Sequence, residues 1–410
     1  MPTAKLYWDD PFALTFETTG ATVSTWESRP SIVMAATRFY PEAGGQLGDT
    51  GWLEVGGVRA AVVDTQITDD GTVHHLLAAA LPDAPASGAL DAVVRGAVDR
   101  DRRIDHMAHH TAQHMLSSAL AQVARAETVS ARLGRDSCTI DLDASATPDR
   151  VLARAEDLVN AVVRDDVAIR AFFPTDAELA TLKLRRAPKV TQGIRVIDIE
   201  GFDQSPCGGT HCTRTGQVGV IRVVGSEKYK GKMRVSFHAA ARVLVDMREK
   251  EQILAALSGE LTCGAADVMA AIAKLRTELR QSRESLGQSR AELAHLVADE
   301  ALARHPVLPD GAETRVVIVR DDDDVPTLRV LAGRLSARAD VVAICLAKAD
   351  GGDFSVVVQR GASSTFDCGA WLKAVAAAHG GRGGGRPERA EGRLSPAAVA
   401  EVARGAEGQR

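Results

Sequence analysis

The chain has 410 residues, 45% apolar and 25% charged, which is enough apolar content for two or three domain cores and excludes wholesale disorder. Its formal net charge of −5 excludes an overall attraction for nucleic acid but is compatible with a local basic surface. The apolar run from Val341 to Ala347 is too short to span a membrane, and no secretory signal opens the chain. Because the six cysteines show no disulfide spacing, we expect a cytoplasmic protein without a membrane partner.

The pattern of short apolar runs and helical periods predicts an α+β protein in four parts. We expect a β-barrel-like domain at residues 1–100, an α+β domain at 101–240, a helical segment at 241–304 and a small α/β domain at 312–410.

The first two parts differ in their apolar period. Short apolar runs separated by turn residues predict strands up to about residue 100. Residues 101–126 have apolar side chains at helical spacing, without Gly or Pro, and a second helix is predicted at 149–163. Further strands are predicted at 138–142, 194–199 and 218–224.

The helical segment at 241–304 contains a heptad-like pattern. Its apolar positions are Ile272, Leu275, Leu279, Leu286, Leu293 and Leu296, with Gly287 as an interruption. Two interpretations remain open: one long helix of an αα-hairpin that packs on its own domain, or a homodimer formed through residues 268–297.

A linker is predicted at 305–311, followed by a small domain with its own core. Strands are expected at 315–319, 341–346 and 354–359, with helices at 327–337 and 370–378. The glycine run that follows is typical either of a flexible loop or of backbone that approaches RNA closely.

Four of the eleven histidines lie between residues 106 and 114. His106, His110 and His114 are each one helical turn apart, so that two of them can converge on one metal ion. The spacing does not say which two, and on this motif alone a histidine face that is solvated or satisfied in the core is the favoured explanation.

A second cluster, Cys207-Gly208-Gly209-Thr210-His211, places a thiol and an imidazole on either side of a flexible turn. The alternative is a tight turn that contains these residues by chance. Mixed nitrogen and sulfur ligands would favour Zn²⁺.

Five motifs together resemble the editing and C-terminal domains of alanyl-tRNA synthetases. FYPEAGGQLGDTG (39–51) resembles the FYPxGGGQxxDxG signature, HTAQHML (110–116) resembles HTAxHLL, and CGGTH (207–211) is similar to the same motif in the family. GKMRV (231–235) and GGGRPERAEG (383–392) resemble later motifs, and Ala43 and Ala240 are departures from the usual glycines. Since little sequence precedes the first motif, the chain resembles the long form of the free-standing AlaX editing proteins.

The resemblance implies a zinc-dependent editing domain that deacylates alanine tRNA mischarged with serine or glycine. It implies that Zn²⁺ is held by His110, His114, Cys207 and His211, which selects one histidine pair. Gln46 and Thr210 become candidates for contacts to the ligands or the substrate, with a turn-capping role as the alternative for each. Ser130 is a candidate for recognition of a substrate hydroxyl. Two alternatives are a threonyl-type editing enzyme and a non-catalytic, zinc-stabilised tRNA-binding module.

The expected partner is aminoacylated alanine tRNA, whose phosphates need cationic surface. The candidates occur in four clusters near the motifs: Arg100, Arg102 and Arg103; Lys183, Arg185, Arg186 and Lys189; Lys228, Lys230, Lys232 and Arg234; and Arg382, Arg386, Arg389 and Arg393.

Overall fold

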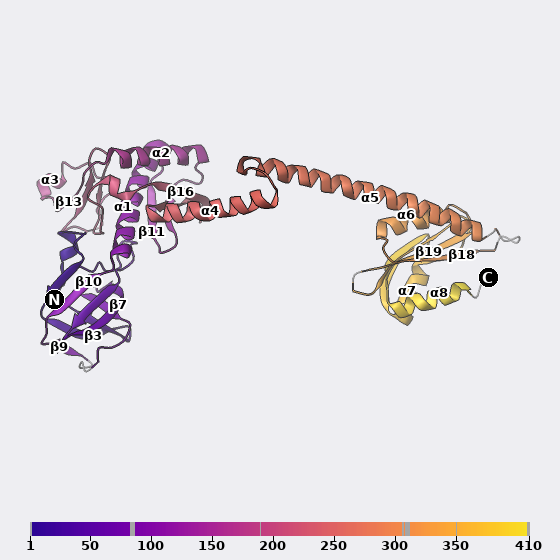
Figure 1. Cartoon of the computed structure of the whole chain (residues 1–410), viewed down its shortest axis with the longest axis horizontal. Coiled ribbons are helices and arrows are strands. Elements are labelled where there is room, and N and C mark those ends of the chain that lie inside the picture. Colours follow the sequence, from indigo (N-terminus) through magenta and orange to yellow (C-terminus); the bar gives the residue numbers. More distant parts are fainter. Residues whose placement is uncertain are drawn as a thin grey trace. The chain divides into compact units, whose positions relative to one another are not determined.

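The computed structural model describes residues 2–82, 87–188, 190–305, 307, 312–349 and 351–407. Most of the predicted linker at 305–311, and Lys189, lie outside these residues. The chain divides into two compact units, Met1–Leu254 and Ala255–Arg410. Both contain helices and sheets, so the predicted α+β class is confirmed (Figure 1).

The first part of unit 1 is β-rich, as predicted. Its main sheet is antiparallel and has eight strands in the order β2-β10-β6-β7-β8-β4-β3-β9. The strands are β2 (Thr15–Thr18), β3 (Ala21–Trp26), β4 (Arg29–Val33), β6 (Gly51–Val55), β7 (Val58–Ile67), β8 (Val73–Leu77), β9 (Gly88–Leu90) and β10 (Val94–Val98). In the described part of the chain β2 and β9 are its edges, so the sheet is open in its hydrogen bonding and the predicted barrel-like closure is not seen.

A short segment beside this sheet places the aromatic residues Tyr7 and Trp8 in the wall of a cavity that His110 and Cys207 also line. It consists of β1 (Ala4–Lys5), which pairs in parallel with β5 (Ala36–Thr37), and of the 3-10 helix η1 (Leu6–Trp8). Tyr7 is buried against Tyr40, with ring centroids 5.3 Å apart.

Helix α1 (Arg100–Ala124) begins at Asp99, whose side chain accepts hydrogen bonds from the backbone N–H groups of Asp101 and Arg102. Every residue from 106 to 120 is buried, because sheets and loops cover the helix on all sides. The histidine face predicted from the sequence therefore lies inside the molecule.

Two small sheets and one long helix pack around α1. One sheet has the order β11-β12-β17-β16 and the other β13-β14-β15. The elements are β11 (Thr128–Leu133), β12 (Cys138–Leu142), α2 (Asp149–Asp165), β13 (Ile169–Phe172), α3 (Asp176–Leu179), β14 (Val196–Ile199), β15 (Asp203–Pro206), η2 (Thr215–Val218), β16 (Ile221–Tyr229) and β17 (Lys232–Ala239). The core includes Leu116, Ile140 and Phe237. The strand predicted at 218–224 is shifted, because residues 215–218 form a 3-10 turn first.

The helical segment consists of α4 (Ala241–Glu260), η3 (Ala265–Asp267) and α5 (Val268–Arg304). No single helix in the described ranges is long and apolar enough to cross a membrane; only α4 and α5 taken together pass that test, by length and composition alone.

The C-terminal sheet has five strands in the order β18-β19-β20-β22-β21. Its elements are β18 (Thr314–Arg320), α6 (Val325–Ser336), β19 (Val341–Lys348), β20 (Phe354–Arg360), α7 (Cys368–His379), β21 (Gly381–Arg386), β22 (Arg389–Leu394) and α8 (Pro396–Glu407). Helices α5 and α6 cover one face, and α7 and α8 the other (Figure 1).

The glycine run is an edge strand, so its interpretation as a loop is wrong. A Cβ at Gly383 would lie 2.8 Å from Leu372 Cδ2 and 2.9 Å from Gly392 Cα. The glycines therefore permit the close approach of β21 to α7 and β22.

Candidate metal centre

Four side chains from two distant segments converge in unit 1. His110 and His114 project from one face of α1, and Cys207 and His211 come from the loop after β15. Their potential ligand atoms all lie within 4.8 Å of one another. Sγ of Cys207 is 3.3 Å from Nε2 of His110 and 3.4 Å from Nε2 of His211. His106 has the same helical spacing but is not part of this group.

Each of the three imidazoles has a different polar group behind its Nδ1 atom. His110 Nδ1 lies 2.7 Å from Oε1 of Gln46, and His211 Nδ1 lies 3.2 Å from the Thr111 hydroxyl. His114 Nδ1 faces a carboxylate oxygen of Asp203 at 3.6 Å. Such contacts orient an imidazole and leave its Nε2 lone pair for a metal.

The donor set fits a zinc ion. His114 is fully buried, and its Nε2 atom has no hydrogen-bond partner. A buried polar atom without a partner is costly, and a metal at Nε2 would satisfy it. Zinc bonds of about 2.0–2.3 Å at tetrahedral angles place neighbouring nitrogen and sulfur ligands about 3.6 Å apart. The two separations from Cys207 Sγ, 3.3 and 3.4 Å, are close to this value.

The electrostatics favour the metal-binding protonation states of Cys207 and His211, whereas Asp203 and Cys207 outweigh burial at His114 and raise its pKa. Burial alone would raise the pKa of the Cys207 thiol, but His110 and His211 outweigh it and hold that pKa well below its ordinary value. Burial, together with neighbouring His110, lowers the pKa of His211 and keeps its imidazole neutral. A thiolate and a neutral imidazole are the forms that coordinate zinc.

Asp203 is a site residue that has no signal in the sequence motifs. Burial opposes its ionisation, but His114 and Arg185 outweigh burial and lower its pKa. Arg185 Nε donates to Asp203 Oδ1 at 2.7 Å. The sequence made Arg185 a candidate phosphate contact, but in the structure its side chain pairs with Asp203 beside the cluster.

Gln46 and Thr210 lie directly beside the cluster and bond to each other. Gln46 Nε2 donates to the Thr210 hydroxyl at 2.8 Å, and the Thr210 N–H donates to Gln46 Oε1 at 3.3 Å. Both residues are completely buried. They connect the loop at 43–46 to the CGGTH loop, and Gln46 also contacts His110.

The loop that carries Gln46 is anchored by a buried ion pair. Asp49 and Arg103 are both fully buried and pair with each other, and Asp49 also accepts the N–H of Tyr40 at 2.7 Å. Arg103 was a candidate phosphate contact, and its burial makes that interpretation wrong. The Asp of the FYPEAGGQLGDTG motif was the available signal for this pair.

Ser130 lies elsewhere on β11. It is exposed, and its hydroxyl donates to Asp141 Oδ2 at 2.7 Å. It does not line the cavity beside the cluster. Its role in recognising a hydroxyl stays a prediction.

A cavity of about 180 Å³ opens beside the cluster. It is lined by Lys5, Tyr7, Trp8, Tyr40, Pro41, Ala43, Gly44, Ile67, His110, Cys207, Gly208 and Gly209. Because His110 and Cys207 form part of its wall, a small molecule in the cavity can reach the cluster.

Three hydrogen bonds from two side chains fix the CGGTH loop beside this cavity. Trp8 Nε1–H donates to the Gly208 carbonyl at 2.8 Å. Arg195 donates to the carbonyls of Cys207 and Gly209 at 3.1 and 2.8 Å. Arg195 was not recognised in the sequence, where it has no motif around it.

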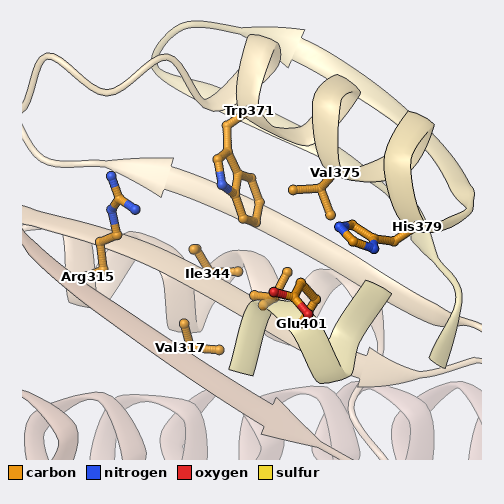
Figure 2. A pocket seen from close by; sticks show the side chains of 8 residues that line it. Arg315, Val317, Ile344, Trp371, Val375, His379 and Glu401 are labelled. Carbon is orange, nitrogen blue, oxygen red and sulfur yellow. The ribbon is translucent and has the colours of Figure 1, made fainter. Parts of the chain in front are cut away.

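Unit 2 has a cavity of its own, of about 150 Å³, between α7, α8 and the sheet. Figure 2 shows Trp371 and His379 of α7 on one side of it and Glu401 of α8 on the other, with Ile344 between them. This lining has one histidine and no cysteine, so it does not offer a second site of the same kind.

Comparison with known proteins identifies the class of these domains. Residues 194–236 match the family described as "Threonyl and Alanyl tRNA synthetase second additional domain", and residues 313–407 match the DHHA1 domain. The first match includes Cys207 and His211.

Alanine–tRNA ligases are similar to this chain over most of its length. The enzyme of Bordetella avium is 31% identical over 90% of this chain, and that of Archaeoglobus fulgidus is 29% identical over 95%. The aligned parts are 43% and 42% of those enzymes, so the chain spans about two fifths of their length. The C-Ala domain of Aquifex aeolicus alanyl-tRNA synthetase is 20% identical, with a TM-score of 0.21, over 23% of this chain and 87% of that domain.

These matches confirm the resemblance of the motifs to alanyl-tRNA synthetases.

Proposed function

We propose that this protein hydrolyses the ester bond of alanine tRNA mischarged with serine or glycine, at a Zn²⁺ held by His110, His114, Cys207 and His211. The observation that carries the proposal is the cluster of three imidazoles and one thiol in the wall of a cavity. The relationship to alanyl-tRNA synthetases supports the choice of substrate.

Elementary energetics explain why such an activity is needed. A synthetase pocket made for a methyl group rejects an added hydroxyl only weakly, and it cannot exclude glycine by size. A second site that hydrogen-bonds the serine hydroxyl discriminates against alanine, because alanine leaves the polar groups of that site unpaired.

When bound, Zn²⁺ supplies Lewis acidity and lowers the pKa of water. The residues of the chain hold the ligands in place: Gln46 positions His110, and Asp203 positions His114. His110 and Cys207 face the cavity, where the aminoacyl end of the substrate would enter. Gln46 and Thr210 therefore act as positioning residues in this proposal.

Phosphate binding is proposed for the β21–β22 hairpin. Arg382 lies directly opposite Arg393, and Arg386 opposite Arg389. All four are exposed. Like charges at directly opposed positions destabilise a pair of strands, and a bound polyanion such as tRNA would relieve the repulsion.

Unit 1 has other exposed cations that could contact phosphate: Lys183, Arg186, Lys228 and Lys230.

All six cysteines are unpaired, which supports the proposal of a reducing, cytoplasmic location.

The test is deacylation of seryl-, glycyl- and alanyl-tRNA that carry the alanine anticodon. Cys207→Ala removes a ligand, and Cys263→Ala, a half-buried thiol outside the cluster, is the matched control. We expect rapid loss of serine, slow loss of alanine, an inactive Cys207→Ala variant and an unchanged control. Binding of charged tRNA without deacylation by zinc-loaded protein would favour the non-catalytic module. Preference for threonine tRNA would favour the threonyl-type enzyme.

A further inference from the structure

Tyr7 lines the cavity beside the metal cluster, and its hydroxyl has no partner within the described ranges. The side chain is 2% exposed, and its ring packs edge-on against Tyr40 and Trp8, with ring centroids 5.3 and 5.8 Å apart. The hydroxyl oxygen is nevertheless not one of the fully enclosed polar atoms that lack a partner. Since the residue is otherwise buried, the open space that this oxygen reaches is the cavity.

The other neutral polar side chains in the cavity wall, outside the cluster, are already bonded to the backbone. The Tyr40 hydroxyl donates to the Ala43 carbonyl at 3.0 Å. Trp8 Nε1–H donates to the Gly208 carbonyl at 2.8 Å. Within this lining, Tyr7 therefore has the one neutral polar side chain outside the cluster that is left for a ligand.

The chemistry of this hydroxyl differs from that of the charged residue in the wall. The Lys5 ammonium, which lies 4.4 Å from the centroid of the Trp8 ring, suits an anion such as phosphate. Burial raises the pKa of Tyr7, so that its hydroxyl stays protonated at neutral pH and can both donate and accept a hydrogen bond. An uncharged group of this kind suits an uncharged alcohol.

We propose that the Tyr7 hydroxyl hydrogen-bonds the side-chain hydroxyl of serine at the aminoacyl end of the tRNA, which makes Tyr7 a specificity-determining residue. This inference rests on the proposed editing function. Serine differs from alanine by one hydroxyl, so serine gives the Tyr7 oxygen a partner and alanine leaves it unpaired. Ser130, the candidate in the sequence for this role, does not line the cavity.

Glycine distinguishes this role from a general effect on the site. Glycine also lacks the hydroxyl, so it gains nothing from Tyr7 and enters the cavity by its small size alone. Loss of the Tyr7 hydroxyl should therefore affect serine selectively. A hydrogen bond between two uncharged groups changes an equilibrium or a rate about tenfold.

The first experiment measures kcat/KM for deacylation of seryl-, glycyl- and alanyl-tRNA that carry the alanine anticodon. For Tyr7→Phe we expect about a tenfold loss with serine and changes within about twofold with glycine and alanine. The matched control is Tyr40→Phe, which removes a hydroxyl of the same wall that holds the loop at 43–46 and should affect the three tRNAs alike. Zinc content and thermal unfolding verify that both variants fold and load metal.

Two results of this experiment would overturn the proposal. Equal losses with serine and glycine in Tyr7→Phe would show that Tyr7 has only a structural role. An unchanged preference for serine in Tyr7→Phe, with a selective loss in Ser130→Ala, would assign the recognition to Ser130.

The second experiment measures binding without hydrolysis, with seryl and alanyl 3′-amide analogues of the terminal adenosine of tRNA. We expect the wild type to bind the seryl analogue about tenfold more tightly and Tyr7→Phe to bind the two equally. This serine preference in a protein that deacylates no tRNA would refute the proposed function and support the assignment of Tyr7. Equal binding of both analogues by the wild type, or binding of neither, would overturn the assignment even in an active enzyme.

Discussion

The two glycines of the CGGTH motif differ in what surrounds them, and this gives the sharpest prediction. A Cβ at Gly209 would lie 2.1 Å from Cε1 and 2.4 Å from Nδ1 of His110, and 3.1 Å from Gln46 Oε1. A Cβ at Gly208 would meet only Cζ2 of Trp8, at 3.9 Å. Neither glycine has a positive φ, so only the available space distinguishes the two positions.

The expected effect follows from these distances. Carbon atoms in contact are about 3.5–4.0 Å apart, so Gly209→Ala must displace the His110 ring or the loop by about 1.4 Å. Zinc–ligand distances are kept within about 0.2 Å, so His110 cannot move that far and remain a ligand. The loss of a group that hydrogen-bonds to a metal ligand already costs about 10–100-fold in metal affinity. We expect Gly209→Ala to lose about 100-fold or more, which is at least about 2.7 kcal/mol. Gly208→Ala should bind zinc nearly as the wild type does.

The assay is a zinc titration against a competing chelator, with Co²⁺ absorption as a direct report on the ligands. Thermal unfolding of both variants controls for a general loss of structure. Equal zinc affinity in the two variants would refute the steric reasoning, and so would a Gly209→Ala variant with an unchanged Co²⁺ spectrum.

Two further predictions concern ion pairs of unit 1. Asp49→Ala leaves Arg103 buried without its carboxylate and should destabilise unit 1 by about 3–5 kcal/mol in urea unfolding; a loss below about 1 kcal/mol would contradict the buried-pair interpretation. Burial opposes the ionisation of Asp105, but His109 and Arg242 outweigh burial and lower the pKa of this carboxyl group. Ionised Asp105 therefore stabilises the fold fully above the unfolded pKa of about 3.9, and this stabilisation is lost as the pH falls below that value. Asp105→Asn should therefore be less stable at neutral pH, with a shallower loss of stability in acid; parallel acid-unfolding curves for variant and wild type would count against this.

Local patterns in the sequence predicted most of the elements near the site. The helical spacing of residues 101–126, the strand at 138–142 and the helix after Pro148 correspond to α1, β12 and α2. These elements depend on the spacing of apolar side chains along the chain, which can be read directly from the sequence. The hairpin β21–β22 was missed because glycine has little strand propensity, and the reason for the glycines, close packing against α7, is tertiary.

Part of the candidate metal centre could also be predicted from the sequence. The sequence alone determined that one helix carries His106, His110 and His114 one turn apart, and that Cys207 and His211 share a short loop. It left the choice of histidine pair to a family resemblance, because helical geometry treats the three residues alike.

Only the tertiary structure brought Cys207 to His110, 97 residues away, and excluded His106 from the cluster. It also placed Gln46 behind His110 and Asp203 behind His114, contacts for which no local pattern exists. The physical reason is that sequence patterns report how a segment folds on itself. The packing of segments that are distant in the chain decides which side chain contacts the Nδ1 atom of a buried imidazole.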